Sequence, residues 1–197
     1  KKMIAAGHIC VDITPAIPGK KGAKINELFI PGKLIEVGDA TVSTGGAVAN
    51  TGLAMKILGG NVSLMGKIGN DAFGGIVKNV LKKYGLEDGL LISDTEATSY
   101  TVVVAVPGID RIFLHNPGAN NAFYADDIPE EELKDAALFH FGYPPIMRSM
   151  YVNDGEELVK MMKMVKEAGA ATSMDLAAVD EASEAGQVDW HHVLERV

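Results

Sequence analysis

The amino-acid sequence predicts an α/β fold: a mostly parallel sheet flanked by helices, with a small β-flap standing off that sheet. Strand-like apolar runs alternate with helix-like runs along most of the chain, which is typical of βαβ units. Residues 33–44 and 98–115 depart from this alternation, because each segment holds strand-like runs with no helix between them. A chain of 197 residues is long enough for one core, or for one domain with a small appendage.

The main sheet and its helices follow from apolar runs bounded by helix start and stop signals. The expected strands are residues 3–9, 61–68, 89–93, 137–141 and 171–175. The expected helices are residues 46–58, 72–84, 129–136, 154–168 and 189–197. Gly59 and Gly60 are placed to end the first helix, and Asp71 to cap the second, which Gly85 ends. Residues 15–32, rich in Pro, Gly and Lys, are expected to form a long loop.

The flap is predicted from two pairs of short strands. Residues 33–37 and 41–44 are strand candidates on either side of a Gly-Asp pair. Residues 98–106 and 111–115 flank a Pro-Gly-Ile-Asp turn and read as a hairpin. Partners this close in the chain pair most naturally as antiparallel strands, so we expect both pairs to stand apart from the parallel sheet.

The amino-acid composition limits the binding partners and the cellular compartment that can be expected for the protein. The formal net charge of −8 disfavours a nucleic acid or an anionic membrane as the main partner, because either would repel the average field of the protein. No run approaches the ~20 apolar residues that a membrane-spanning helix needs. Cys10 is the only cysteine, so an intrachain disulfide cannot form and a reducing, cytoplasmic location is expected.

Residues 44–50 form the strongest candidate for a binding site. Gly45 and Gly46 follow a strand-like run and open a helix-like run, and Asn50 comes one turn later. This pattern places bare backbone N–H groups and an amide side chain where a hydroxyl-rich ligand could bind. A purely structural interpretation stays open: the glycines could form a tight turn, Asn50 could be a solvated helix residue, and Asp12 could cap a turn.

Four short motifs occur in a fixed order along the chain. They are residues 7–12 (Gly-His-Ile-Cys-Val-Asp), residues 45–50 (Gly-Gly-Ala-Val-Ala-Asn), residues 66–74 (Gly-Lys-Ile-Gly-Asn-Asp-Ala-Phe-Gly) and residues 116–120 (Asn-Pro-Gly-Ala-Asn). Together, and with the two-part flap, they resemble the ribokinase-like (PfkB) family of carbohydrate and nucleoside kinases. The resemblance implies that residues 1–197 are the N-terminal portion of such an enzyme, with the flap as a lid.

The resemblance implies a substrate-binding site made of Asp12, Gly45, Gly46, Asn50, Thr101, Phe113 and Tyr143. The Asp12 carboxylate would accept hydrogen bonds from sugar hydroxyls, and the two glycines would let the backbone approach the sugar. Asn50 would exchange further hydrogen bonds with hydroxyls. Thr101 and Phe113 would cover an apolar sugar face from the flap, and Tyr143 would contact the substrate from a strand end.

Two positions depart from the pattern of ribokinases proper. Cys10 stands where those enzymes usually carry Asn, and a thiol is a poor replacement for an amide. Tyr143 stands in place of their acidic residue. Both departures put ribose itself in doubt as the substrate.

The resemblance also implies parts that these residues do not contain. In the family, a later Gly-Ala-Gly-Asp segment supplies the catalytic Asp and an anion hole, and the site for ATP and Mg²⁺ lies mainly in that later part. The expected catalytic Asp therefore lies beyond Val197, and the 197 residues alone are expected to be inactive. No metal site is predicted within them, since adjacent His191 and His192 diverge on a helix.

The leading hypothesis is the substrate-binding portion of a sugar kinase that transfers the γ-phosphoryl of ATP to a sugar hydroxyl and dimerises through its lid. A nucleoside kinase of the same family is the alternative within this class. A non-catalytic sugar-binding or regulatory module, because the catalytic half is absent, is an alternative of another class. A dinucleotide-binding protein is disfavoured, because residues 7–12 lack a G-x-G-x-x-G phosphate loop.

Overall fold

A computed structural model describes residues 1–19 and 24–197 of the chain. The strands are β1 (Lys2–Gly7), β2 (Cys10–Pro15), β3 (Ala40–Gly45), β4 (Asn61–Gly69), β5 (Leu90–Ser93), β6 (Tyr100–Val104), β7 (Ile112–Asn116), β8 (Ala136–Gly142) and β9 (Ala171–Asp175). The α-helices are α1 (Ile25–Leu28), α2 (Gly46–Ile57), α3 (Ala72–Lys82), α4 (Glu130–Leu133), α5 (Arg148–Glu167) and α6 (Trp190–Glu195). Short 3₁₀ helices lie at Glu87–Gly89, Gly118–Ala122, Ala125–Asp127, Pro144–Ile146 and Ala185–Gln187.

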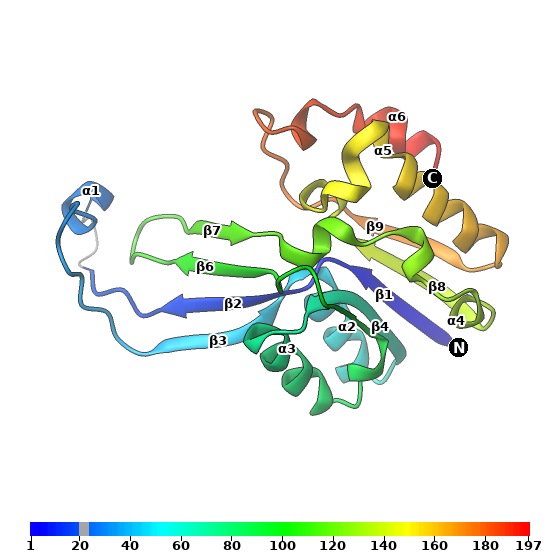
Figure 1. The fold of residues 1–197 in the computed structure, drawn as a ribbon, viewed down its shortest axis with the longest axis horizontal. Coiled ribbons are helices and arrows are strands. Elements are labelled where there is room, and N and C mark those ends of the chain that lie inside the picture. Colours follow the sequence, from blue (N-terminus) through cyan, green and yellow to red (C-terminus); the bar gives the residue numbers. More distant parts are fainter. Residues whose placement is uncertain (20–23) are drawn as a thin grey trace.

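The larger sheet is parallel throughout and has five strands in the order β5-β4-β1-β8-β9. Successive side chains of β1 enter different hydrophobic clusters, as the two-residue period of a strand requires. Ala5 packs with Leu64, Val48 of α2 and residues of α3, whereas Ile4 joins the cluster that contains Leu158 of α5. Helices therefore cover both faces (Figure 1), and the predicted α/β class with a mostly parallel sheet is confirmed.

The smaller sheet is the flap, which extends from the main sheet as an arm with α1 near its far end (Figure 1). Its four strands run in the order β3-β2-β6-β7. The β2–β3 and β6–β7 pairs are antiparallel, and β2 and β6 are parallel, so the flap is a mixed sheet. The hairpin expected within residues 98–115 is present as β6 and β7.

The first half of the flap differs from the sequence-based prediction. Residues 33–39 form no strand, and the side chain of Leu34 is 99% exposed, so this segment buries no face that would hold it in a sheet. The partner of β3 is instead β2, which the sequence analysis did not predict. A signal for β2 exists, because residues 10–14 (Cys-Val-Asp-Ile-Thr) alternate in the period of a half-buried strand.

Most helices lie where they were expected, with shifted ends. Helix α5 begins at Arg148 and is interrupted at residues 152–155, whose φ/ψ angles are not helical, so its regular part matches the predicted helix at 154–168. The predicted loop at residues 15–32 contains the single turn α1, and residues 20–23 of that loop lie outside the described residues. None of the helices in the described ranges is long and apolar enough to cross a membrane.

Two glycines let α2 lie close against the sheet. A Cβ added to Gly142 at the end of β8 would overlap the methyl group of Ala47 in α2. A Cβ added to Gly52 in α2 would overlap the side chain of Leu64 in β4. The small residues at these contacts therefore set the distance of α2 from the sheet.

We expect Gly142→Ala to lower the free energy of unfolding by about 1–3 kcal/mol, the usual cost of overpacking a core. Gly75→Ala is the matched control, because no atom of α3's surroundings lies within 4 Å of the added Cβ. That control should raise the free energy of unfolding by about 0.5–1 kcal/mol. Chemical denaturation measures both changes. A Gly142→Ala variant as stable as the unaltered protein would show that α2 does not pack this closely on β8.

Candidate functional site

The candidate site lies where the C-terminal ends of β1 and β8 meet the flap. Only His8 and Ile9 separate β1 from β2, so the chain passes directly from the main sheet into the flap. The Gly45-Gly46 step joins β3 of the flap to α2. Ligands of parallel α/β sheets bind at the carboxyl ends of the strands, which is where these segments converge.

One face of the flap carries a row of polar side chains. The register pairs Asp12 with Ser43 on one side and with Thr101 on the other, and pairs Thr101 with His115. Paired residues project from the same side of a sheet, so these side chains form one row across the four strands. Cys10 lies two residues before Asp12 in β2 and therefore shares this face.

These side chains are joined by successive contacts. The Cys10 Sγ lies 3.3 Å from Asp12 Oδ1, and the Thr101 Oγ1 lies 3.8 Å from Cys10 Sγ. The same hydroxyl lies 3.0 Å from His115 Nδ1, whose Nε2 is 3.4 Å from His8 Nε2. A continuous chain of polar contacts therefore runs from the β1–β2 connection, through the flap, to the Asp12 carboxylate.

The surroundings keep the interior groups of this chain uncharged. His8 is 2% exposed, and burial, followed by the nearby His115, lowers the pKa of His8 to about 3. Desolvation also lowers the pKa of His115, although the Asp12 carboxylate opposes it. Burial, followed by the charge of Asp12, raises the pKa of the Cys10 thiol. At neutral pH the imidazole of His8 is neutral and the thiol keeps its proton.

The two glycines bring the backbone against the polar groups. A Cβ added to Gly45 would overlap the carboxylate of Asp12. Gly46 has a φ of +85°, and a Cβ there would overlap the carbonyl and the imidazole of His8. Both positions thus require glycine for steric reasons. The same two residues form the turn from strand to helix and bring the backbone close to Asp12 and His8.

The structure brings some of the predicted site residues together and leaves others apart. Asp12, both glycines and Thr101 meet at the junction, and Tyr143 adjoins it through His8, with ring centroids 6.0 Å apart. Phe113 lies two residues before His115 on the same face of β7 and is 54% exposed. Asn50 is exposed one turn after Gly46. Within the described residues, neither Phe113 nor Asn50 takes part in the polar contacts that lead to Asp12.

Sequence reasoning missed His8 and His115 and did not place Cys10 against Asp12. Cys10 is buried, but its thiol also contacts Asp12. The missed signal is the alternation of β2, which places Cys10 and Asp12 on one face once the strand is recognised. The position of His115 opposite Thr101 depends on the hairpin register, which the sequence did not fix.

The other two motifs of the chain have structural roles. Asp71 caps α3 as predicted, with Oδ1 accepting from Gly74 N and Oδ2 from Thr98 N, both at 2.8 Å. The buried Asn120 holds the β1–β2 connection: its Oδ1 accepts from Ile9 N at 3.1 Å, and its Nδ2 donates to Ile9 O at 2.9 Å. Both backbone groups of Ile9 are thereby satisfied by one amide.

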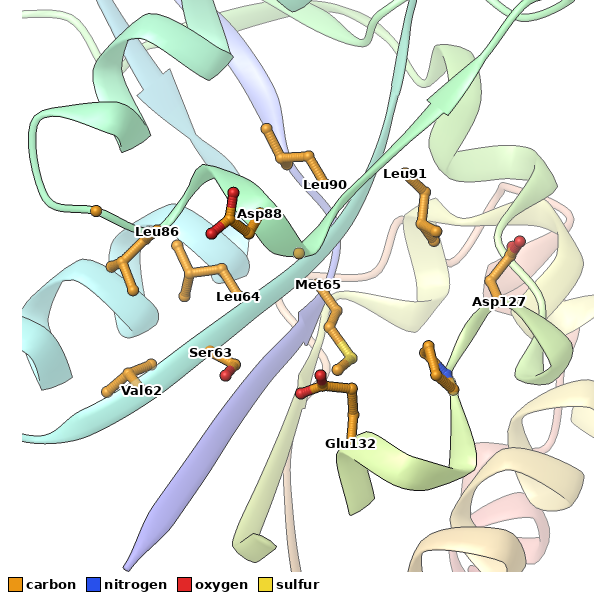
Figure 2. A pocket seen from close by; sticks show the side chains of 13 residues that line it. Val62, Ser63, Leu64, Met65, Leu86, Asp88, Leu90, Leu91, Asp127 and Glu132 are labelled. Carbon is orange, nitrogen blue, oxygen red and sulfur yellow. The ribbon is translucent and has the colours of Figure 1, made fainter. Parts of the chain in front are cut away.

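A separate hollow of about 270 Å³ lies between β4, β5 and the segment that leads into α4 (Figure 2). Two carboxylates in its lining are already paired. Asp127 Oδ2 lies 2.9 Å from Lys67 Nζ, and Glu132 pairs with Lys2. The residues of the candidate site do not line this hollow, so it belongs to another part of the sheet. Within residues 1–19 and 24–197, no group of three or more His, Cys, Asp or Glu side chains could hold a metal ion.

The strand ends of a parallel α/β sheet, here facing a flap that bears a carboxylate, are a typical place for a small polar ligand to bind. Comparison with protein families identifies the class of protein. The family described as "pfkB family carbohydrate kinase" matches residues 9–193, and the chain belongs to this family.

The relatives include plant fructokinases. The chain is 28% identical over 180 residues to Fructokinase-1 of Zea mays, covering 88% of this chain and 50% of the maize protein. It is 29% identical over 180 residues to Probable fructokinase-3 of Arabidopsis thaliana, covering 88% of this chain and 47% of that protein. The chain thus spans about half the length of the curated relatives it matches.

Solved structures share the fold. The fructokinase from Xylella fastidiosa matches with a TM-score of 0.72 and 23% identity, over 93% of this chain and 54% of that one. An uncharacterized sugar kinase from Pyrococcus horikoshii matches with a TM-score of 0.73 and 21% identity, over 100% and 59%. At these identities the likeness establishes the fold, and the site is argued from this chain's own residues.

The lowered pKa of His8 makes stability depend on pH. The unfolded chain binds the proton near pH 6.5, whereas the folded chain binds it only near pH 3. As the pH falls through this window, the free energy of unfolding should therefore fall, by at most about 1.4 kcal/mol per pH unit from this residue. Denaturant unfolding from about pH 7.5 to about 5 should give a shallower slope for His8→Gln. His192→Gln, the same substitution at an exposed position of α6, is the matched control and should keep the original slope. Equal slopes for His8→Gln and the unaltered protein would contradict the assignment.

Proposed function

We propose that this chain is the substrate-binding portion of an ATP-dependent sugar kinase and that the substrate class is a ketohexose such as fructose. Membership of the carbohydrate kinase family and the likeness to fructokinases support the proposal. The observation that carries it is the Asp12 carboxylate, held at the strand ends against the bare backbone of Gly45. An ionised carboxylate accepts hydrogen bonds from sugar hydroxyls, and the missing side chain of Gly45 leaves room for this carboxylate.

The flap and its neighbours complete the proposed site. Asn50, exposed one turn into α2, would exchange hydrogen bonds with further hydroxyls. Phe113 and Thr101 come from the flap, and Tyr143 from the end of β8, so the sugar would lie between the two sheets. Closure of the flap as a lid would exclude water from the reacting hydroxyl. Cys10, in place of Asn, favours a sugar other than ribose.

ATP and Mg²⁺ do not fit the residues described here. These residues offer no group of side chains that could hold a metal ion, and no glycine-rich phosphate loop. The Xylella fastidiosa fructokinase was solved with bound ATP. Because the chain spans about half the length of the plant relatives it matches, we propose that ATP, Mg²⁺ and the catalytic Asp belong to a part that residues 1–197 do not include, and we expect these residues alone to be inactive.

The proposal is tested with the full-length protein that carries this sequence, in an ATP-consumption assay with fructose, ribose and adenosine. Fructose should be the preferred acceptor, and Asp12→Asn should lower kcat/KM for it by about 10- to 150-fold, the loss expected for one hydrogen bond to a charged group. Asp110→Asn, in the exposed turn of the β6–β7 hairpin, is the control and should leave kcat/KM unchanged.

The other outcomes decide among the remaining functions. Preference for adenosine would favour a nucleoside kinase. Fructose binding without ATP consumption would favour a non-catalytic sugar-binding module. Heat stability that no sugar or nucleoside increases would refute the assignment of the site.

We also propose that two copies associate through the flap. The face opposite the polar row is apolar, and Val42, Ile112 and Leu114 are 47%, 41% and 57% exposed on it. Exposed apolar side chains gathered on one face of a sheet are typical of a surface that another protein covers. The symmetric partner that fits such a surface is a second copy of the chain.

Leu114→Glu should shift the protein from dimer to monomer, because it places a charge in the covered surface. Sedimentation velocity measures the shift. Lys163→Glu is the control, since this residue is exposed on α5, a helix that packs on the main sheet, and it should leave the dimer intact. A monomer before any substitution would refute this arrangement.

A further inference from the structure

We propose that His8, His115, Thr101 and Cys10 form a positioning chain that orients the Asp12 carboxylate toward its ligand. The inference rests on the proposed function, since the ligand is taken to be a sugar. None of the four side chains is proposed to contact the reacting atoms. Their role would be to hold Asp12 in one orientation and to make that orientation depend on the position of the flap relative to the main sheet.

Proton positions in the first half of the chain follow from Asp12. An ionised carboxylate only accepts, so the Cys10 thiol donates to Asp12 Oδ1 at 3.3 Å. The Thr101 hydroxyl donates its one proton to Cys10 Sγ at 3.8 Å. The Thr101 Oγ1 can then only accept, and its donor is His115 Nδ1 at 3.0 Å.

The two imidazoles complete the chain. A neutral His115 that carries its proton on Nδ1 has a bare Nε2, which accepts from His8 Nε2 at 3.4 Å. His8 then carries no proton on Nδ1, and this buried atom has no hydrogen-bond partner within the described residues. One arrangement of protons therefore satisfies every contact, and it fixes opposite tautomers for the two rings.

The chain leaves one carboxylate oxygen for the ligand. Oδ1 of Asp12 is engaged by the thiol, whereas Oδ2 lies against the backbone of Gly45 and receives no hydrogen bond from the described residues. His115 and Thr101 belong to flap strands, and His8 belongs to the connection from the main sheet. Asp12 and Cys10 also belong to a flap strand, so displacing the flap would break the His8–His115 contact, the link that joins this chain of contacts to the main sheet.

The tautomers are the direct test. In full-length protein labelled with ¹⁵N-histidine, NMR at neutral pH should show His115 protonated on Nδ1 and His8 on Nε2. His8→Gln and His115→Gln variants assign the signals. Thr101→Val should abolish the Nδ1 tautomer of His115, because it removes the acceptor. The same tautomer on both rings, or rapid exchange between tautomers, would overturn the proposal.

Sugar affinity tests the positioning role. By calorimetric titration with D-fructose, Cys10→Ala and Thr101→Val should weaken binding about tenfold, because Asp12 loses its fixed orientation. Cys10→Ser keeps a donor to Asp12 and an acceptor for Thr101, so it should restore binding. Thr41→Val, the same substitution at an exposed position of β3, is the control. Equal weakening by Cys10→Ser and Cys10→Ala would refute the role, and the Cys10 pair decides it even where Thr101→Val does not fold.

The two tests separate the two proposals. Fructose binding that no variant weakens overturns the positioning chain and leaves the proposed function in place. Absence of fructose binding by the unaltered protein overturns the proposed substrate, and the tautomers then still decide whether the chain exists.

Discussion

The two-residue connection between the sheets is the constraint on which the site depends. His8 and Ile9 turn the chain from the end of β1 into β2, and the Asn120 amide holds both backbone groups of Ile9. Because Asn120 follows the last flap strand, this amide ties the entry of the flap to its exit. A small change at the connection would move the whole flap, and Asp12 with it, relative to the main sheet.

The close packing of α2 at its start also depends on the connection formed by His8 and Ile9. Val48 N donates to the carbonyl of His8 at 3.1 Å, so the helix is joined to the connection by its own backbone. Gly46 and Gly142 allow this approach, since a side chain at either position would overlap His8 or Ala47. The binding geometry is therefore produced by main-chain contacts, and the polar side chains are arranged upon them.

Local patterns in the sequence were enough to predict the parallel sheet, the helices that cover it and the glycine turn before α2. They were also enough for the capping role of Asp71, because a cap is a contact within one turn. The pairing of β3 with β2 was missed, since strand pairing depends on tertiary neighbours. The contact between His8 and His115 was beyond local reasoning for the same reason, because 107 residues separate them. The family resemblance named Asp12 and the glycines as expected site residues, but it did not predict the contact between Cys10 and Asp12.

Side chains of β2 point alternately to the two faces of the flap, so substitutions in this strand have two kinds of effect. Its even-numbered residues, such as Cys10 and Asp12, face the polar row, whereas Val11 and Ile13 belong to the apolar cluster on the other side. Substitutions at even positions would change the polar face of the flap, and those at odd positions would change how the flap packs on the body of the protein. The polar face of this strand can thus change while its packing is preserved. Insertion of one residue into β2 would turn the side chains that follow it to the opposite face of the flap.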